Sequence, residues 1–270
     1  MFNKYLEKVV SGNNLKVEQM EKAMNAVMEG KITNSQLAGF LIGLRMKGES
    51  IDEITGAARV MRNKAVPIQN NGTLIDTCGT GGDKSGTFNI STTVALVLAG
   101  SNLTVAKHGN RSVSSQSGSA DVLETLGINL DLKPEQVEKC LQELGMGFLF
   151  APVFHKSMKH AITPRKELQV RTIFNILGPL TNPARAEYQV LGVYDPELVT
   201  PLAEVLKNLG IKGAMVVHGA GGLDEFSLSG KNKVAHLQNG KIKTFTITPE
   251  DVGLNRAKLN KIKGGNPEKN

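Results

Sequence analysis

The sequence has few of the residues on which several large classes of function depend. It contains no tryptophan, and aromatic residues make up only 4% of its 270 residues, so stacking platforms for single-stranded nucleic acid are scarce. No run of apolar residues approaches the roughly 20 that a membrane-spanning helix needs. The amino terminus also lacks the apolar block of a signal peptide. We therefore expect a cytoplasmic protein without a membrane partner.

Cysteine is equally scarce. The chain has only Cys78 and Cys140, and their spacing fits neither a zinc site nor a disulfide framework. Cys78 lies inside the most informative motif of the chain. We interpret it as a small buried side chain and not as a reactive thiol.

The charge balance favours anionic partners. The chain has 32 basic and 25 acidic residues, a net charge of +7, and a pI near 9.3. The basic residues are spread along the chain, apart from a lysine-rich tail at 258–269. This pattern is typical of a solvated basic surface and, second to that, of a protein with a small anionic substrate.

Hydrophobic periodicity predicts two kinds of structure along the chain. Up to about Ala65 the pattern is helical only: apolar residues of 17–28 fall on one face, and Thr33 to Gln36 resembles a capping box. After residue 66, short strands alternate with helices. Strands are expected at 74–77, 103–106, 147–151, 188–193 and 214–217, and helices at 89–99, 120–126 and 196–209. From 226 to 247 the pattern suggests a hairpin with a turn at Gln238-Asn239-Gly240.

This alternation indicates an α/β protein, in which a small all-helical domain accompanies a larger α/β domain with a mainly parallel central sheet. The segment 154–184 interrupts the alternation. It reads as helix broken only at Pro164 and at Gly178-Pro179. We interpret it as a return of the chain to the helical domain.

The sharpest motif is the segment 76–92, DTCGTGGDKSGTFNIST. A predicted strand runs into a glycine-rich loop, and the loop runs into a helix that begins with polar residues. Glycines let backbone N–H groups turn toward a ligand, and the helix amino terminus adds partial positive charge. The spacing matches neither a Walker A loop nor a dinucleotide fingerprint. The segment therefore predicts a pyrophosphate cradle, with a plain tight loop as the alternative.

A second motif is the segment 107–119, KHGNRSVSSQSGS. It follows the predicted strand 103–106, so it should lie at the same carboxyl edge of the sheet as the first loop. Two cations, an imidazole and five hydroxyl groups in this stretch suit a multiply charged phosphate ester. A basic solvent-exposed loop would seldom carry so many small residues.

Two further patterns complete the set. Asp224 and Glu225 follow a glycine-rich strand end, a setting that suits hard, oxygen-preferring magnesium, although an isolated acidic pair is usually only surface charge. The stretch 152–183 places His155, Arg165 and Arg171 among apolar residues. The guanidinium of Arg165 could pair with a carboxylate, and charge on a helix surface is the alternative.

Taken together, GTGGD…TFNIST, KHGNRSVSS, FLFAPVFHKSM…R…VRTIFNILGPLTNPA and VVHGAGGLDE resemble the anthranilate phosphoribosyltransferase family of tryptophan biosynthesis. The resemblance runs along the whole chain. It implies the nucleoside-phosphorylase-like class III phosphoribosyltransferase fold, with a helical domain at 1–66 and approximately 163–186 and an α/β domain at 67–162 and 187–270. It also implies a homodimer formed through the helical domain.

The resemblance further implies a reaction. The 5-phosphoribosyl group of phosphoribosyl pyrophosphate (PRPP) would move to the amine of anthranilate, with release of pyrophosphate. Magnesium, Lys107 and backbone donors would neutralise the leaving group. Domain closure would exclude water. No dedicated catalytic general base is expected, because the aromatic amine is already neutral at pH 7.

The family's functional positions can be carried over one by one. Members of the family continue beyond Asn270 with further helices, so this chain is expected to keep every ligand position but to lack some packing around the sheet. The implied PRPP contacts are Gly79, Gly82, Asp83, Thr87, Asn89, Ile90, Ser91, Thr92, Lys107, Ser115 and Ser119. Two Mg²⁺ ions would be held by Ser91, Asp224 and Glu225, and anthranilate by Gly79, Asn110, His155 and Arg165, with Arg165 facing its carboxylate.

Two other functions compete with this one. A pyrimidine-nucleoside phosphorylase would share the fold and a glycine-rich loop but would need no magnesium, and the Asp224-Glu225 pair argues against it. A non-enzymatic nucleic-acid-binding relative would explain the net charge of +7 and would bind with a steep salt dependence. His155 and Arg165 in an apolar setting are better explained by a small aromatic acid, so a nucleic-acid partner is not expected.

Overall fold

The chain folds into two compact units. The computed structural model describes residues 2–83, 85–112 and 116–270. One unit comprises the residues up to Val66 together with Phe154–Thr181, and the other comprises Pro67–Val153 with Asn182–Asn270. The segment that returns to the first unit thus begins at Phe154 and not near residue 163. The start of this segment is tied to the first unit because Val66 N donates to Phe154 O over 2.9 Å.

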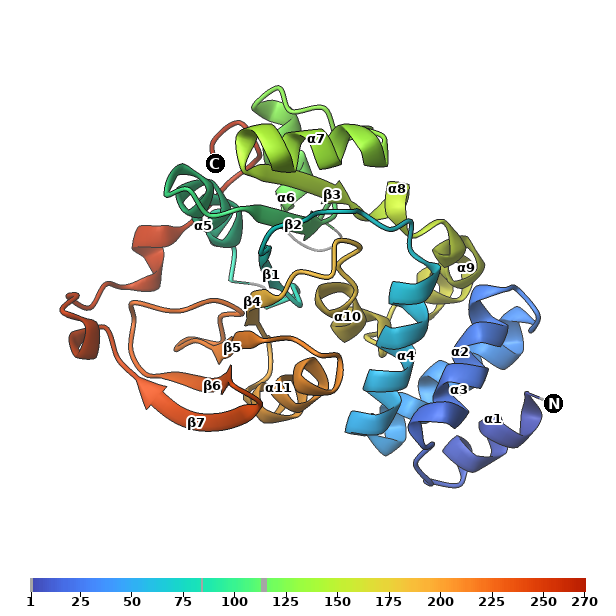
Figure 1. Cartoon of the computed structure of the whole chain (residues 1–270). Helices are drawn as coiled ribbons and strands as arrows, with labels where there is room; N and C mark the ends of the chain where they lie inside the picture. The colour runs from blue at the N-terminus through green and yellow to red at the C-terminus, as the bar shows by residue number, and fades with distance from the viewer. Residues whose placement is uncertain (1, 84, 113–115) are drawn as a thin grey trace. The chain divides into compact units, whose positions relative to one another are not determined.

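The first unit is helical, as the periodicity predicts (Figure 1). The capping box at Thr33 is present: its side chain accepts from Gln36 N at 3.2 Å, and its backbone N–H donates to Gln36 Oε1 at 3.0 Å. The predicted apolar face of the second helix, including Met20 and Met24, is fully buried. The helices of this unit are α1 (Asn3–Val10), α2 (Val17–Met28), α3 (Asn34–Lys47), α4 (Ile51–Lys64), η1 (Lys156–Met158), α9 (Lys159–Leu168), α10 (Phe174–Leu177) and η2 (Gly178–Leu180).

The predicted break at Pro164 is wrong, because helix α9 continues through it to Leu168. A proline inside a helix removes one backbone hydrogen bond. Here Pro164 and Ala161 are the buried residues of α9, so apolar burial of the ring offsets that loss. The helix ends instead at Gln169, which has the left-handed φ of 51°. The predicted break at Gly178-Pro179 is where α10 gives way to η2.

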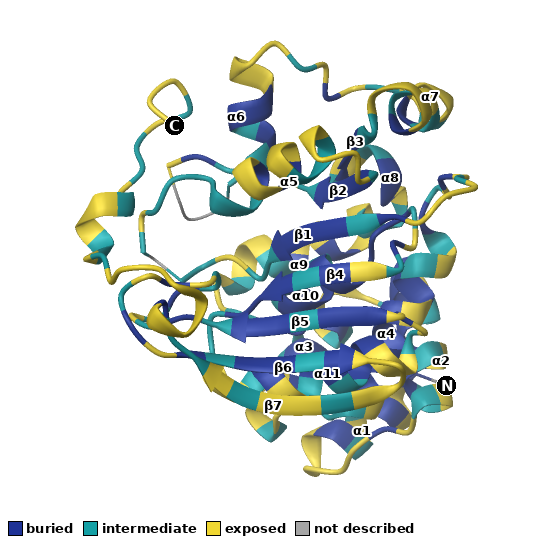
Figure 2. Ribbon diagram, turned by 60° about the vertical axis from the view of Figure 1, so that its left-hand side comes forward, coloured by how far each residue is buried: buried dark blue, intermediate teal, exposed yellow. Residues whose placement is uncertain are grey.

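The second unit is built on a seven-stranded sheet with the order β3-β2-β1-β4-β5-β6-β7. Strands β3, β2, β1, β4 and β5 run parallel, and β6 and β7 are antiparallel additions, so the predicted mainly parallel sheet is confirmed. Figure 2 shows β5 largely buried and β7 exposed at the edge. The strands are β1 (Ile75–Gly79), β2 (Val105–Gly109), β3 (Met146–Phe150), β4 (Tyr188–Gly192), β5 (Gly213–His218), β6 (Asn232–Gln238) and β7 (Lys241–Ile247).

The predicted hairpin is present but shorter than expected. Strands β6 and β7 are joined by Asn239 and Gly240, whose φ values of 51° and 71° are those of a tight hairpin turn. Residues 226–231 form turns and no strand. Asn232 closes these turns, because its side chain accepts from Ser227 N at 2.7 Å and donates back to Ser227 O at 3.1 Å.

Helices pack on this sheet as an α/β alternation requires. The predicted helix 196–209 is present but begins as the short η3. The helix Pro134–Leu144 (α7) was not predicted, although Pro134 at its first position and the left-handed Gly145 after it are standard boundary signals. Within the described residues, no helix combines the length and hydrophobicity that crossing a membrane requires. The helices are α5 (Ile90–Gly100), α6 (Ser119–Thr125), α7 (Pro134–Leu144), α8 (Ala151–Phe154), η3 (Pro196–Leu198), α11 (Val199–Asn208), η4 (Glu250–Val252) and η5 (Leu259–Ile262).

The strand order determines where a ligand can bind. Strand β1 has β2 on one side and β4 on the other, so the order of the chain reverses at β1. In open α/β sheets, ligands bind outside the carboxyl ends of the strands at such a reversal. Strands β1, β2 and β4 end at Gly79, Gly109 and Gly192, and Gly219 directly follows β5.

Candidate active site

The Asp224-Glu225 pair lies directly against the carboxyl ends of three strands, in space that glycines leave open. A methyl group on Gly79 would lie 2.5 Å from Asp224 Oδ2, and one on Gly192 would lie 1.5 Å from the Asp224 carbonyl oxygen. One on Gly219 would lie 2.2 Å from the Glu225 carbonyl oxygen. Sequence reasoning missed Gly192 and Gly219. The sequence pattern that could have identified them is the glycine at or just after the end of each successive apolar strand.

The two carboxylates hold the glycine-rich loop at both ends. Asp224 Oδ2 accepts from Gly81 N at 2.6 Å, and Glu225 Oε1 accepts from Ser91 N at 3.1 Å. Burial, with the charge of Asp83 second, raises the pKa of Asp224 to about 6. Burial, followed by the charge of Asp224, raises the pKa of Glu225 to about 8. Burial thus disfavours the charged forms of both carboxylates, and a bound cation would stabilise those charged forms.

These carboxylates fit a magnesium ion that shares its ligands with a substrate. They supply oxygen donors, which hard divalent cations prefer. Among residues 2–83, 85–112 and 116–270, no group of three or more His, Cys, Asp and Glu side chains is arranged to hold a metal ion by itself. Magnesium usually binds one or two carboxylates and takes its other ligands from water and phosphate groups. The donor set of Asp224 and Glu225 matches that mode.

Lys107 lies inside strand β2 and sends its ammonium group to the end of β1. Its Nζ donates to Thr77 O at 2.5 Å and to Ser91 Oγ at 3.3 Å, and the residue is 1% exposed. Burial lowers the pKa of Lys107, and the charge of Asp76 is the largest opposing influence. Lys107 thus places a buried cation beside Ser91, at the start of the helix that follows the loop.

Asp76 is a member of the site that sequence reasoning did not single out. It is fully buried, and its Oδ1 accepts from His108 N at 3.3 Å. Burial raises the pKa of Asp76, while Lys107 lowers it. The sequence could have indicated Asp76, because an acidic residue inside an otherwise apolar strand is unusual and often functional. Cys78, two residues on, is buried as predicted, and burial raises the pKa of its thiol, so it is unsuited to act as a nucleophile.

The predicted phosphate contacts gather at the amino terminus of α5. Ile90, Ser91 and Thr92 form its first turn, where the helix dipole favours an anion, although the N–H groups of Ile90 and Ser91 donate to Phe88 O and Glu225 Oε1. Thr92 is buried, and none of the described residues is a hydrogen-bond partner for its Oγ1. Thr87 lies just before this turn, with its Oγ1 3.3 Å from Ser85 Oγ.

Asn89 connects the two predicted phosphate loops. Its Nδ2 donates to Ser117 O and its Oδ1 accepts from Ser117 Oγ, both at 3.2 Å. In the second loop, the carbonyl oxygen of Asn110 accepts from Ser119 Oγ at 3.3 Å and from Ala120 N at 3.2 Å. The structure therefore brings the ends of both loops together. Ser115, another predicted PRPP contact, lies outside the described residues.

The predicted acceptor residues His155 and Arg165 belong to the helical unit. His155 is buried, which lowers its pKa to about 4 against the opposing effect of a hydrogen bond to the Thr181 backbone. The guanidinium carbon of Arg165 lies 5.0 Å from the centroid of the Phe174 ring, and burial lowers its pKa. No ion pair within the described part of the chain involves Arg165.

The buried His155 makes a testable contribution to the pH dependence of stability. Its pKa falls from 6.5 to about 4 on folding, so between these values the unfolded chain takes up a proton that the folded chain does not. The free energy of unfolding should therefore fall as the pH drops from 6.5 to 4, by about 3 kcal/mol from this group. Urea unfolding of the original chain and of His155→Gln at several pH values measures this contribution. The free energy of unfolding should decline less steeply with falling pH in the variant.

The exposed His160 in the same unit supplies the control. His160→Gln should keep the pH profile of the original chain. Equal profiles for the original chain and His155→Gln would contradict the buried, neutral state of His155.

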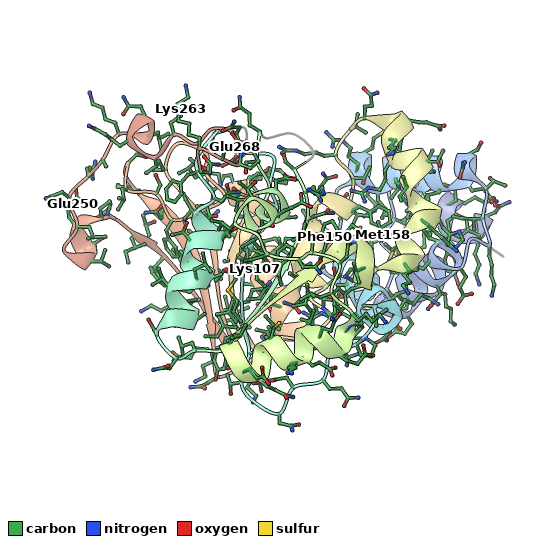
Figure 3. All side chains as sticks on the ribbon, turned by 90° about the horizontal axis from the view of Figure 1, so that it is seen from above. Lys107, Phe150, Met158, Glu250, Lys263 and Glu268 are labelled. Carbon is green, nitrogen blue, oxygen red and sulfur yellow. The ribbon has the colours of Figure 1, made fainter. Side chains whose placement is uncertain are left out.

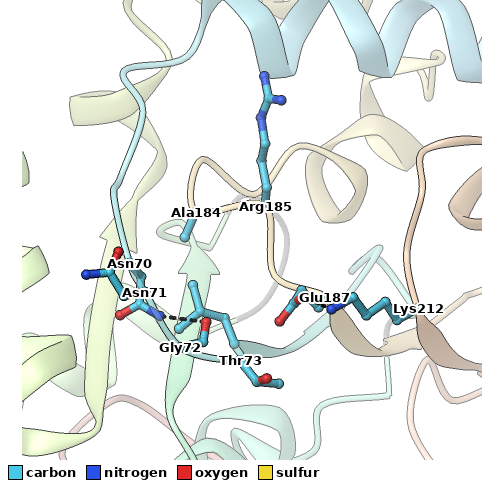
Figure 4. A pocket seen from close by; sticks show the side chains of 9 residues that line it. Asn70, Asn71, Gly72, Thr73, Ala184, Arg185, Glu187 and Lys212 are labelled. Atoms are coloured by element: carbon cyan, nitrogen blue, oxygen red, sulfur yellow. Dashed lines mark hydrogen bonds and ion pairs between the residues drawn. The ribbon is translucent and has the colours of Figure 1, made fainter.

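A polar cavity of about 410 Å³ lies away from this site (Figure 4). It is lined by residues that precede β1, β4 and β5, among them Gly72, Arg185 and Lys212, so it sits at the amino ends of these strands. Glu187 and Lys212 form an ion pair across it. None of the predicted site residues lines this cavity.

Comparison with known proteins agrees with the geometry. Two family models match: one described as "Glycosyl transferase family, helical bundle domain" over residues 3–65, and one as "Glycosyl transferase family, a/b domain" over residues 71–270. Anthranilate phosphoribosyltransferase of Petrotoga mobilis is 63% identical over 271 aligned residues, which cover 100% of this chain and 79% of that protein.

Solved structures give the same result. Anthranilate phosphoribosyltransferase of Thermus thermophilus matches with a TM-score of 0.92 and 48% identity, over 98% of this chain and 79% of that one. The Saccharomyces cerevisiae enzyme, in complex with PRPP and Mg, matches with a TM-score of 0.90 and 30% identity, over 99% of this chain and 78% of that one. This chain belongs to the anthranilate phosphoribosyltransferase family.

Proposed function

We propose that this chain transfers the 5-phosphoribosyl group of PRPP to the amine of anthranilate and releases pyrophosphate, a step of tryptophan biosynthesis. One observation carries the proposal: the glycine-rich loop, the amino terminus of α5 and the Asp224-Glu225 pair meet at the carboxyl end of β1. This arrangement provides the positive end of a helix dipole for a diphosphate and carboxylates for its counter-ion. The membership of the family and the yeast relative's complex with PRPP and Mg support the same reaction.

The diphosphate would bind where the structure offers donors and positive charge. The first turn of α5 supplies the positive end of a helix dipole, and the ammonium group of Lys107 lies 3.3 Å from Ser91 Oγ in this turn. As the ribosyl C1–O bond breaks, negative charge grows on pyrophosphate, and these fixed groups stabilise it without reorganising. The proposed PRPP contacts are Gly79, Gly82, Asp83, Thr87, Asn89, Ile90, Ser91, Thr92, Lys107, Ser115 and Ser119.

Magnesium fits the same place. Ser91, Asp224 and Glu225 would hold two ions, directly or through the diphosphate. Bound magnesium supplies positive charge that stabilises the leaving pyrophosphate. The position of Asp224 and Glu225 supports this assignment, because both carboxylates lie against the strand ends beside the glycine-rich loop and bond to Gly81 N and Ser91 N.

Anthranilate would be received by Arg165, His155, Asn110 and Gly79. The guanidinium of Arg165 is backed by the Phe174 ring and suits the carboxylate of an aromatic acid. The His155 ring stays neutral because its pKa is about 4, so it is too weak a base to take a proton at neutral pH and acts by packing. The neutral amine needs no general base to attack, so positioning of the two substrates supplies the remaining rate enhancement.

We also propose that the chain forms a cytoplasmic homodimer through its helical unit. Val10 and Met46 in this unit are 67% and 83% exposed, and such apolar side chains are candidates for burial against a partner. Size measurement by light scattering tests the assembly.

The acceptor assignment predicts the behaviour of Arg165→Ala. Loss of anthranilate fluorescence should require the chain, PRPP and Mg²⁺ together. In Arg165→Ala, the KM for anthranilate should rise by roughly tenfold to a hundredfold, the range for losing a charge-assisted pair. The KM for PRPP should stay the same, because the variant leaves the diphosphate contacts unchanged.

The adjacent exposed Lys166 gives a matched control, and Lys166→Ala should behave like the original chain. Consumption of anthranilate without PRPP would refute the proposed reaction. Magnesium-independent phosphorolysis of a pyrimidine nucleoside would instead identify the phosphorylase, which the carboxylate pair and the named relatives do not favour.

A further inference from the structure

A segment near the end of the chain pairs with the diphosphate loop. Phe88 N donates to Ile262 O at 3.0 Å, and Gly264 N donates to Gly86 O at 2.8 Å. These bonds flank an antiparallel bridge between Thr87 and Lys263. Residues 262–264, here called the pairing segment, therefore form a short two-stranded ribbon with residues 86–88. Figure 3 labels Lys263 on this segment, which follows η5.

Gly264 makes this close pairing possible. A methyl group there would lie 2.6 Å from Thr87 O and 2.7 Å from both Phe88 N and Thr87 C. All three atoms belong to the backbone, so no flexible side chain can move aside. An alanine at 264 would push the pairing segment away from the loop or displace the loop itself.

The paired residues lead directly into the anion-binding turn. Thr87 and Phe88 precede Asn89 by one or two residues, and α5 begins at Ile90. Phe88 is also bonded to the start of this helix, because Ile90 N donates to Phe88 O at 2.8 Å. Glycines give the preceding part of the loop conformational freedom, because Gly81, Gly82 and Gly86 have left-handed φ values of 69°, 73° and 64°.

We propose that the pairing segment is a positioning element of the diphosphate site, and that Gly264 is the residue on which its action depends. The segment acts through its backbone: it fixes Thr87 and Phe88, so that the start of α5, with the positive end of its helix dipole, is held in place before PRPP arrives. Pre-organisation of this kind raises affinity because the loop loses less freedom on binding. The inference rests on the proposed binding of PRPP at this loop.

The test is binding of PRPP with Mg²⁺ to the full chain by calorimetry, in the absence of anthranilate. Gly264→Ala should weaken binding by roughly tenfold or more. Hydrogen exchange supplies a second readout, because the Phe88 amide should exchange faster in Gly264→Ala. The melting temperature should change little, since residues 262–264 contribute no strand to the sheet.

Two variants serve as controls. The three atoms nearest to a methyl group on the adjacent Gly265 all belong to the flexible side chain of Lys269, so Gly265→Ala should bind PRPP like the original chain. Lys263→Ala removes a charge but keeps the backbone bonds, so it should also bind normally. If Lys263→Ala weakens binding as much as Gly264→Ala, the segment acts by charge and the proposal is overturned.

Unchanged PRPP binding and unchanged Phe88 exchange in Gly264→Ala would also overturn it. Failure of the proposed function looks different, because the original chain itself would then not bind PRPP. If Gly264→Ala does not fold, the exchange rate of the Phe88 amide in the original chain tests whether the pairing segment holds the loop. Exchange as fast as that of an unstructured amide would show that the pairing does not hold the loop.

Discussion

Replacement of Glu225 with glutamine is expected to lower kcat/KM for PRPP by roughly a thousandfold without destabilising the folded chain. Glu225 accepts a hydrogen bond from Ser91 N and lies beside Asp224. Glutamine keeps its size and an acceptor oxygen but removes the negative charge that would hold magnesium, and the magnesium would balance the charge of the leaving pyrophosphate. Losing a fixed charge of this kind typically costs two to three orders of magnitude in rate, roughly 10²–10³-fold.

The stability of the same variant separates a functional role from a structural one. Burial, with Asp224 nearby, raises the pKa of Glu225 to about 8, so the charged carboxylate is disfavoured in the folded chain when no cation is bound. Glu225→Gln should therefore unfold at the same or a higher urea concentration. Steady-state kinetics at saturating Mg²⁺ and urea unfolding without it measure the two effects.

Glu197 offers a control on the surface, since it makes only a 3.6 Å ion pair with Lys233 and its side chain is 86% exposed. Glu197→Gln should keep both activity and stability. Activity of Glu225→Gln within a few-fold of the original would show that this carboxylate does not take part in the reaction.

The sequence predicts the course of the fold better than its boundaries. Alternating strands and helices, the capping box at Thr33 and the Asn239-Gly240 turn are local signals, and each is present in the structure. The expected break at Pro164 failed because tertiary packing buries the ring in its helix. Helix α7 was not predicted although Pro134 and Gly145 mark its ends, because in its 11 residues only Val137 and Leu141 are buried, which gives a weak periodic signal.

The candidate site likewise contains residues that the sequence reveals and residues that it does not. The residues in the glycine-rich loop and the Asp224-Glu225 pair carry chemistry in their side chains, so a sequence motif reveals them. Asp76 was missed because its partner, Lys107, lies 31 residues away and meets it only through the pairing of β1 with β2. Gly192 was missed because its contribution is the space it leaves, which no linear pattern displays.

Gly192 is accordingly expected to be among the least replaceable residues of the α/β unit. It ends strand β4 without a left-handed φ, so alanine would suit its backbone and only space opposes the change. A methyl group would lie 1.5 Å from the Asp224 carbonyl oxygen and 2.3 Å from its carbonyl carbon. Because these are backbone atoms, the Asp224-Glu225 segment must move away from the strand ends.

Gly192→Ala should thus reduce both stability and activity. Overpacking against backbone predicts a loss of roughly 3 kcal/mol in the free energy of unfolding. A displacement of about 1 Å in a positioned group can reduce the rate by about a hundredfold, so kcat should fall by at least that factor. The Mg²⁺ concentration for half-maximal activity should rise as well, because both carboxylates move with the segment.

Gly100, at the end of α5, provides the control. Apart from its chain neighbours and the backbone of its own helix, no atom of the described residues lies within 4 Å of a methyl group built on it, so Gly100→Ala should leave stability, kcat and the Mg²⁺ requirement unchanged. If Gly192→Ala kept its Mg²⁺ requirement and lost only stability, the strand ends would support the fold without setting the position of the metal-binding carboxylates.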